Sequence, residues 1–235
     1  MNKFIVVSGG TKGIGRAIIE KFASEGFSVA TCARNKADLD ELKQAIEKKH
    51  QGCQVHVQVA DLSDNSQTES FVHFVNSLRQ PVEVLVNNAG YFLPGLIHNE
   101  APGTLESMIQ TNLYSAYHLT RGLIGEMIQR RDGYVFTLCS TASIMAYPNG
   151  GSYCIAKHAL LGMTKVLREE MKPHNIRVTA VLLGATLTAS WEGVDLPAER
   201  FMKSEDVADA IFSAFSLSKN SVVEEILIRP QLGDI

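Results

Sequence analysis

The feature that most constrains the fold of this chain is a regular alternation of short β-branched runs with longer amphipathic segments. Most of the short runs are nearly continuously apolar, as in strands that are buried on both faces. The longer segments have the periodicity of helices. The predicted strands are 4–7, 27–33, 53–60, 82–88, 133–140, 176–183 and 224–228, and the predicted helices are 14–25, 36–49, 65–79, 104–130, 151–172 and 204–217.

Strands that alternate with helices favour a parallel sheet with right-handed crossovers and helices on both faces. The 235 residues contain no linker, repeat or low-complexity tract. The pattern therefore predicts an α/β protein with a single-domain Rossmann fold over residues 1–235, built on a doubly wound, seven-stranded parallel sheet. Residues 184–203 form a long irregular stretch, where we expect a substrate loop, because long loops in compact domains are usually functional.

Composition and charge exclude several classes of protein. Hydrophobic residues make up 45% of the chain and charged residues 20%, which is ordinary for a globular protein. The net charge of −3 gives no reason to expect nucleic acid, and no charge block or long apolar run suggests a membrane. The four cysteines and seven histidines lack metal-ligand or disulfide-framework spacing, so no metal is predicted. We expect a cytoplasmic protein.

The first predicted strand runs into a glycine-rich stretch, SGGTKGIG at residues 8–15, in which a helix begins. Open parallel sheets bind ligands at the carboxyl ends of their strands. Glycines there allow the backbone to approach a pyrophosphate, and the helix N-terminus offers N–H groups to it. The spacing is Gly-x-x-x-Gly-x-Gly and not GxGxxG, so a structural turn is the alternative. Lys12 and Arg16 favour an anionic ligand.

A tyrosine and a lysine lie four residues apart in SYCIAKHAL, residues 152–160, within a predicted helix. Positions i and i+4 share one helix face. A phenol is an inefficient acid or base near neutral pH unless its phenolate is stabilised, and a neighbouring ammonium provides that stabilisation. The pair alone could arise by chance, so its meaning depends on the other motifs.

Taken together, the ordered motifs resemble the short-chain dehydrogenase/reductase family. They are SGGTKGIG, NNAG at 87–90, Asn112 in TNLYSAY, Ser140, Tyr153 and Lys157, and they span nearly the whole chain. Three positions depart from the family pattern. Ser8 stands where Thr is usual, Ser143 takes a frequent Gly position, and Leu183-Gly184 replaces Pro-Gly, which leaves the path of the following loop open.

The resemblance implies an oxidoreductase that reduces a carbonyl group of a small molecule to an alcohol, or catalyses the reverse. Tyr153 would donate the proton, while Lys157 stabilises its phenolate and holds the nicotinamide ribose. Ser140 would polarise the carbonyl, and Asn112 would kink its helix and hold a relay water. The implied cofactor-binding residues are Ser8, Gly9, Thr11, Lys12, Gly13, Ile14, Gly15, Arg34, Asp61, Leu62, Asn88, Ala89, Gly90, Tyr153, Lys157 and Thr188.

The cofactor and the substrate can be predicted only in part. Arg34 ends the second strand, where NAD-specific enzymes place an acid, and with Lys12 it suits the 2′-phosphate of NADP(H). Asp61 would lie by the adenine, although it could equally belong to the N-cap region of the next helix. The implied substrate residues, beside Ser140, are Tyr91, Tyr147 and Trp191.

Two alternatives to a general carbonyl reductase stay open. The first is a 3-oxoacyl-[acyl-carrier-protein] reductase of fatty acid synthesis. The N-terminal half resembles these reductases as well as the C-terminal half resembles the sepiapterin-reductase-like branch of the family. A non-catalytic NADP-binding sensor is the other alternative.

The segments 104–130 and 151–172 carry apolar residues on more than one face, and with the resemblance this predicts a homodimer or homotetramer.

Overall fold

The computed structural model describes residues 3–188, 191, 193 and 195–234. Seven strands form one parallel sheet in the order β3-β2-β1-β4-β5-β6-β7, which confirms the predicted doubly wound topology. The chain order reverses between β1 and β4, and ligands bind at this switch point in open α/β sheets. The strands are β1 (Lys3–Ser8), β2 (Phe27–Ala33), β3 (Val55–Val59), β4 (Val84–Asn87), β5 (Gly133–Ser140), β6 (Ile176–Leu183) and β7 (Glu225–Ile228).

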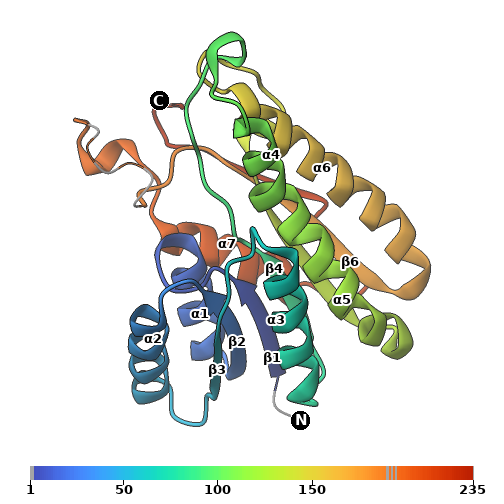
Figure 1. Ribbon diagram of the computed structural model, residues 1–235. Coiled ribbons are helices and arrows are strands. Elements are labelled where there is room, and N and C mark those ends of the chain that lie inside the picture. Colours follow the sequence, from blue (N-terminus) through green and yellow to red (C-terminus); the bar gives the residue numbers. More distant parts are fainter. Residues whose placement is uncertain (1–2, 189–190, 192, 194, 235) are drawn as a thin grey trace.

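Helices cover both faces of the sheet (Figure 1). One face packs against α1, α2 and α7, and the opposite face packs against α3, α5 and α6. The helices are α1 (Gly13–Ser24), α2 (Lys36–Lys49), α3 (Asn65–Ser77), α4 (Thr104–Ile109), α5 (Ser115–Arg130), α6 (Gly151–Met171) and α7 (Ser204–Ser216). Within the described residues, no helix is both long and apolar enough to cross a bilayer.

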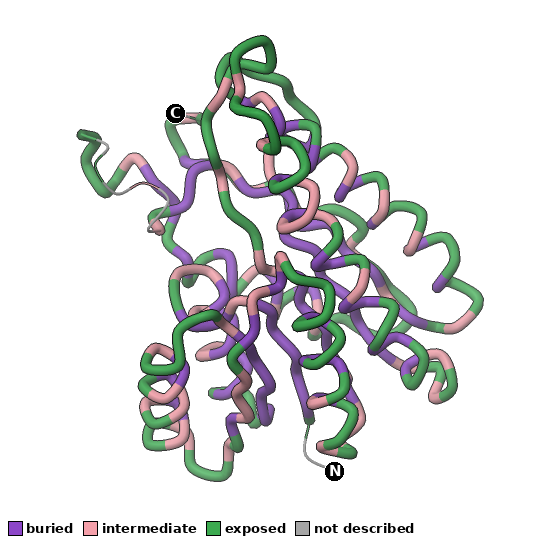
Figure 2. The backbone as a smooth tube through the Cα atoms, viewed as in Figure 1, coloured by how far each residue is buried: buried purple, intermediate pink, exposed green. Residues whose placement is uncertain are grey.

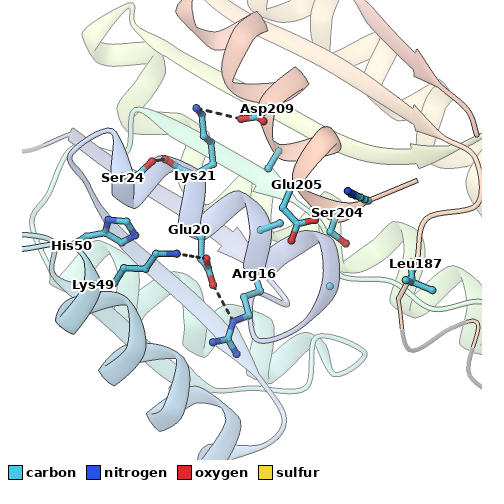
Figure 3. Close-up of a pocket in the computed structure, with 14 residues that line it drawn as sticks. Arg16, Glu20, Lys21, Ser24, Lys49, His50, Leu187, Ser204, Glu205 and Asp209 are labelled. Atoms are coloured by element: carbon cyan, nitrogen blue, oxygen red, sulfur yellow. Dashed lines mark hydrogen bonds and ion pairs between the residues drawn. The ribbon is translucent and has the colours of Figure 1, made fainter. Parts of the chain in front are cut away.

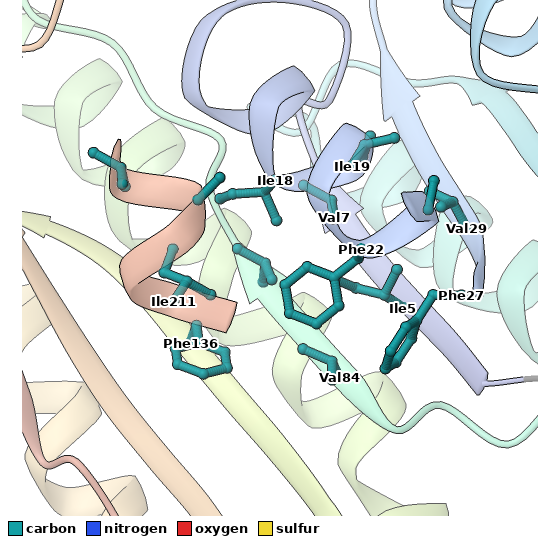
Figure 4. Close-up of a cluster of buried hydrophobic side chains, with 14 of the residues drawn as sticks. Ile5, Val7, Ile18, Ile19, Phe22, Phe27, Val29, Val84, Phe136 and Ile211 are labelled. Atoms are coloured by element: carbon teal, nitrogen blue, oxygen red, sulfur yellow. The ribbon is translucent and has the colours of Figure 1, made fainter. Parts of the chain in front are cut away.

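The hydrophobic core consists of two layers, one on each side of the sheet. Successive side chains of a strand point to opposite faces, so Ile5 and Val7 join the layer under α1 and α7, while Phe4 and Val6 join the layer under α3 and α5. Figure 4 shows the first layer, in which Phe22 of α1 fills the space beside the strands. Burial is concentrated in the sheet and the inner helix faces (Figure 2). This double burial explains the continuous apolar runs of the sequence.

The prediction of one continuous helix over 104–130 was wrong in one respect. The segment consists of α4, a π-helical turn at Gln110–Tyr114, and α5. π-Helical turns inside helices occur frequently at functional sites. Asn112 lies in this turn, which agrees with the expectation that it distorts its helix.

Candidate active site

The glycine-rich loop is fixed to the end of β4 by side-chain hydrogen bonds. The Ser8 hydroxyl accepts hydrogen bonds from the backbone N–H groups of Asn88 and Ala89, both at 2.9 Å. The Asn88 side-chain amide donates to the carbonyl oxygens of Ser8 and Gly9, at 2.8 and 2.9 Å. Ser has the same hydroxyl as the Thr that is usual in the family, and the hydroxyl is the part of the Ser8 side chain that binds Asn88 and Ala89. The departure from Thr therefore leaves these hydrogen bonds intact.

The glycines of this loop are required by its close approaches. A Cβ on Gly15 would lie 2.6 Å from Nδ2 of Asn88 and would overlap the carbonyl oxygen of Gly9. Gly13 has a φ of +53°, which side chains rarely adopt. The loop leads directly into α1, whose first-turn N–H groups suit an anionic ligand. The geometry is that of a phosphate cradle.

Thr31 supports this loop and was missed by the sequence analysis. Its buried hydroxyl donates to the carbonyl oxygen of Val7 at 2.6 Å and accepts from the backbone N–H of Gly10 at 3.1 Å. A Cβ on Gly10 would overlap both the Thr31 hydroxyl and Ile19. A hydroxyl in a buried strand was the one available signal, but Ser28 of the same strand carries one too, and neither reveals a partner 21 residues away.

Lys12 and Arg34 lie on the side of the loop that faces β2 and α2. Arg34 is exposed in the bend that follows β2, and Asn35 caps α2 with its side chain. Nζ of Lys12 lies 2.9 Å from a carboxylate oxygen of Asp38, in the first turn of α2. Both cations predicted to recognise a 2′-phosphate are therefore exposed at the carboxyl end of β2.

Asp61 lies after β3, as expected, and its carboxylate is bound within the turn that follows, while its predicted place beside the adenine stays a prediction. Its carboxylate accepts hydrogen bonds from the backbone N–H and the hydroxyl of Ser63, at 3.0 and 2.7 Å. The N-cap of α3 is instead Asp64, whose side chain accepts from the N–H of Ser66. Asp61 therefore shapes the turn at the end of β3 and does not cap the helix.

Asn112 is fully buried and holds the segment that follows β4. Its side-chain oxygen accepts from the backbone N–H of Tyr91 at 3.2 Å, and its amide donates to the carbonyl oxygens of Tyr91 and Met108, at 3.1 and 3.2 Å. A Cβ on Gly90 would lie 2.6 Å from this oxygen and 3.6 Å from Nζ of Lys157. Gly90 thus leaves just enough space for Asn112 and Lys157 to share one site.

Tyr153 and Lys157 lie on one face of the first turns of α6, as their spacing predicted. Nζ of Lys157 donates to the carbonyl oxygen of Leu138 at 2.9 Å and lies 5.7 Å from the centre of the Tyr153 ring. Lys157 is 6% exposed, and this burial together with the hydrogen bond to Leu138 fixes the position of Nζ. The Tyr153 ring packs edge-on against Phe92, with 4.9 Å between ring centres.

Ser140 ends β5 and faces the same site. Its hydroxyl accepts from the N–H of Ala142 at 3.1 Å, and its own N–H donates to the Ser143 hydroxyl at 3.2 Å. These bonds form a capping box for the short helix Thr141–Ser143. Ser143 therefore has a defined role at the position where the family often has Gly.

A cavity of about 510 Å³ brings the predicted residues together. It lies at the carboxyl end of the sheet and contains all four predicted catalytic residues and the three predicted substrate residues. Burial raises the pKa of Tyr147 above its usual value, so this phenol stays protonated as a hydrogen-bond donor. The residues that line the cavity include Gly90, Tyr91, Asn112, Ser140, Tyr147, Tyr153, Lys157, Thr188, Trp191 and Asp234.

Asp234 enters this cavity from the C-terminal tail and was not predicted. A Cβ on Gly184 would lie 2.9 Å from Pro230 and 2.5 Å from a carboxylate oxygen of Asp234. The tail therefore packs directly on the Leu183-Gly184 position that departs from the family pattern. The carboxylate also lies 3.5 Å from Nε of Arg229.

A second cavity, of about 620 Å³, lies outside the sheet along α1 and α7 (Figure 3). Arg16 lines this cavity and not the first one. Its guanidinium binds both carboxylate oxygens of Glu41, at 2.8 and 3.0 Å, and one of Glu20 at 3.3 Å. Arg16 is therefore paired with two carboxylates, while Gly13 of the glycine-rich loop lines the same cavity, and the expectation that Arg16 favours an anionic ligand stays a prediction.

The doubly wound sheet, the glycine-rich loop at its switch point and the adjoining cavity are typical of nucleotide-binding α/β proteins. The chain belongs to the short chain dehydrogenase family, whose family model matches residues 3–197. It is 29% identical to the sepiapterin reductase of Chlorobaculum tepidum over 100% of this chain and 99% of that protein.

Solved structures agree with this assignment. An alcohol dehydrogenase of the archaeon Thermococcus sibiricus, complexed with 5-hydroxy-NADP, is 25% identical and superposes with a TM-score of 0.91 over 97% of each chain. The L-sorbose reductase of Gluconobacter frateurii, complexed with NADPH and L-sorbose, is 26% identical with a TM-score of 0.88, over 97% of this chain and 95% of that one.

Proposed function

We propose that this protein is an NADP(H)-dependent carbonyl reductase, in which Asn112, Ser140, Tyr153 and Lys157 act on a small ketone or alcohol. The observation that carries the proposal is the placement of all four side chains around one cavity beside the glycine-rich cradle. The relatives with bound NADP(H) support the choice of cofactor.

The residues present fit a nicotinamide dinucleotide. Glycine at position 15 lets the loop pack closely against the start of α1, since any Cβ there would overlap the carbonyl oxygen of Gly9, and the first-turn N–H groups of that helix suit a pyrophosphate. Lys12 and Arg34 supply positive charge for a 2′-phosphate. Asp61 and Leu62 follow β3, and Asn88 to Gly90 follow β4, which are the positions expected for adenosine contacts. The bound cofactor supplies or accepts the hydride.

The chain's own residues handle the proton and the orientation of the substrate. Tyr153 donates its phenolic proton to the carbonyl oxygen, and the Lys157 ammonium stabilises the phenolate that remains. Ser140 donates a hydrogen bond to the same oxygen and polarises the carbonyl. Asn112 maintains the π-helical turn near Lys157. By the family resemblance, this turn holds a water that returns the proton from solvent.

The substrate chemistry follows from the cavity lining. Tyr91, Tyr147 and Trp191 line the cavity with aromatic side chains, and Asp234 contributes one carboxylate to it. The segment 184–203, of which Trp191 is part, serves as the substrate loop. We therefore propose a substrate with an apolar or aromatic body next to its carbonyl group. A homodimer or homotetramer and a cytoplasmic location stay predictions from the sequence.

The test compares two tyrosines of the same cavity. Tyr153→Phe is expected to lower kcat by about 10²–10⁴ and to leave the NADPH dissociation constant nearly unchanged, because only the hydroxyl is lost. Tyr147→Phe is the matched control and is expected to change KM more than kcat. Activity is read as NADPH oxidation across acetoacetyl thioesters, pterins, diketones and sugars.

Two outcomes would contradict the proposal. Near-native kcat of Tyr153→Phe on a good ketone would mean that another group is the acid. Tight NADPH binding without oxidation by any substrate of the screen would instead support the non-catalytic sensor.

A further inference from the structure

Residues 91–103, which belong to the segment between β4 and α4, contact the active site and the start of α6 at three points. At its start, the backbone of Tyr91 is held by Asn112, and the ring of Phe92 packs against Tyr153. Further along, the N–H of Gly95 donates to the carbonyl oxygen of Asn149 at 3.0 Å, and Gly95 forms a parallel bridge with Gly150. The segment is therefore fixed to the residues that immediately precede α6.

The third contact is made by the carboxylate of Glu100. One oxygen accepts from the backbone N–H of Ser152 at 2.9 Å, and the other accepts from the Ser152 hydroxyl. These hydrogen bonds hold the pKa of Glu100 below its usual value, so the carboxylate is ionised under working conditions. The N-cap residue of α6, Gly150, makes no side-chain capping bond, and Glu100 satisfies a first-turn donor in its place.

Glycines on both sides make room for this carboxylate. A Cβ on Gly151 would overlap a carboxylate oxygen of Glu100, and a Cβ on Gly95 would lie 2.8 Å from its Cγ. Gly151 also has a φ of +33°. The first turn of α6 is thus shaped around the side chain of a residue 52 positions earlier in the chain.

We propose that Glu100 is a positioning residue for Tyr153. Its carboxylate, which comes from the segment 91–103, caps the N-terminus of α6 by binding Ser152. Ser152 directly precedes Tyr153, so the bond from Glu100 fixes the turn that sets the direction of the phenol. The negative charge also lies at the N-terminus of a 21-residue helix, where the helix dipole favours it. This inference rests on the proposed role of Tyr153 as the acid.

The expected effect is on catalysis rather than on cofactor binding. Glu100→Ala is expected to lower kcat by about 10- to 100-fold, the loss that a misplacement of about 1 Å produces. The NADPH dissociation constant should change less than about twofold, since the glycine-rich cradle is untouched. Ser152→Ala, which keeps the bond to the backbone N–H, should give a smaller loss. Glu106→Gln removes an exposed carboxylate from the first turn of α4 and is the control without effect.

Two further measurements separate positioning from a general structural role. In the Tyr153→Phe background, Glu100→Ala should add almost nothing, because the group that it positions is gone. An equal further loss in that background would overturn the proposal, as would a kcat of Glu100→Ala within twofold of the native value. Amide hydrogen exchange at residues 152–157 should be faster in Glu100→Ala and unchanged in Glu106→Gln.

The exchange measurement also separates this proposal from the proposed function. If Tyr153→Phe stays active, the proposed function fails whatever Glu100 does. If Tyr153→Phe is inactive but exchange at residues 152–157 is the same in Glu100→Ala and the native protein, only the positioning role fails. Should Glu100→Ala fail to fold, Glu100→Gln keeps one acceptor for the Ser152 N–H and is measured in the same way.

Discussion

The buried hydroxyl of Thr31 allows a test of how the cofactor cradle is held together. Thr31→Val keeps the shape of the side chain but removes both hydrogen bonds, so the N–H of Gly10 loses its acceptor in the core. An unsatisfied buried backbone donor costs about 1–3 kcal/mol. In a chain of this length, that loss of free energy of unfolding lowers Tm by roughly 2–4 °C per kcal/mol.

The same loss should reach the cofactor site, because the freed Gly10 leaves the loop next to Gly9 less ordered. We expect NADPH to bind several-fold more weakly to Thr31→Val, as measured by fluorescence titration. Thr31→Ser keeps the hydroxyl and should retain cofactor binding.

Thr137→Val provides the matched control for stability. Thr137 is equally buried, in β5, and its hydroxyl has no hydrogen-bond partner within the part of the chain that the structure describes. Its replacement by Val should therefore leave the free energy of unfolding unchanged or raise it. Equal destabilisation by Thr31→Val and Thr137→Val in urea titrations would refute the reasoning, because the hydrogen bonds of Thr31 would then contribute nothing to the free energy of unfolding.

Three further predictions concern cofactor choice, pH and assembly. Arg34→Asp should shift the ratio of kcat/KM values from NADPH toward NADH, and equal use of both by the native enzyme would contradict the proposed role of Arg34. Burial, with the nearby Asp132 adding to it, raises the pKa of Glu83 above its usual 4.5, so its ionised form destabilises the native state. Glu83→Gln should therefore raise Tm most at pH 8, with the gain fading as the pH falls through that raised pKa; an equal gain at pH 4 would be inconsistent with this cause. Light scattering at micromolar concentration should give the mass of a dimer or tetramer, and a monomer mass would refute the predicted assembly.

The sequence by itself determined the order of the elements and the positions of most site residues. Nearly continuous apolar runs indicate strands that are covered on both faces, and with the alternating valines of 53–60 they predicted all seven strands to within a few residues. The motifs were equally local, because a phosphate cradle and an i, i+4 pair are built from neighbours in the chain. These features predicted Gly15 at the start of the helix that follows β1, and Tyr153 and Lys157 four residues apart in one helix, and the structure has them there.

Tertiary structure alone decided how those residues are held. Ser8 binds residues 80 and 81 positions away, and Glu100 binds Ser152 across 52 positions. The position of the Arg16 guanidinium likewise depends on a partner far along the chain, since Glu41, which binds it, lies on another helix. Hydrogen bonds and ion pairs of this kind depend on distances that exist only after the sheet and its helices have packed. No periodicity or local motif records those distances, so the sequence could name the proposed reacting groups but not the side chains that hold them.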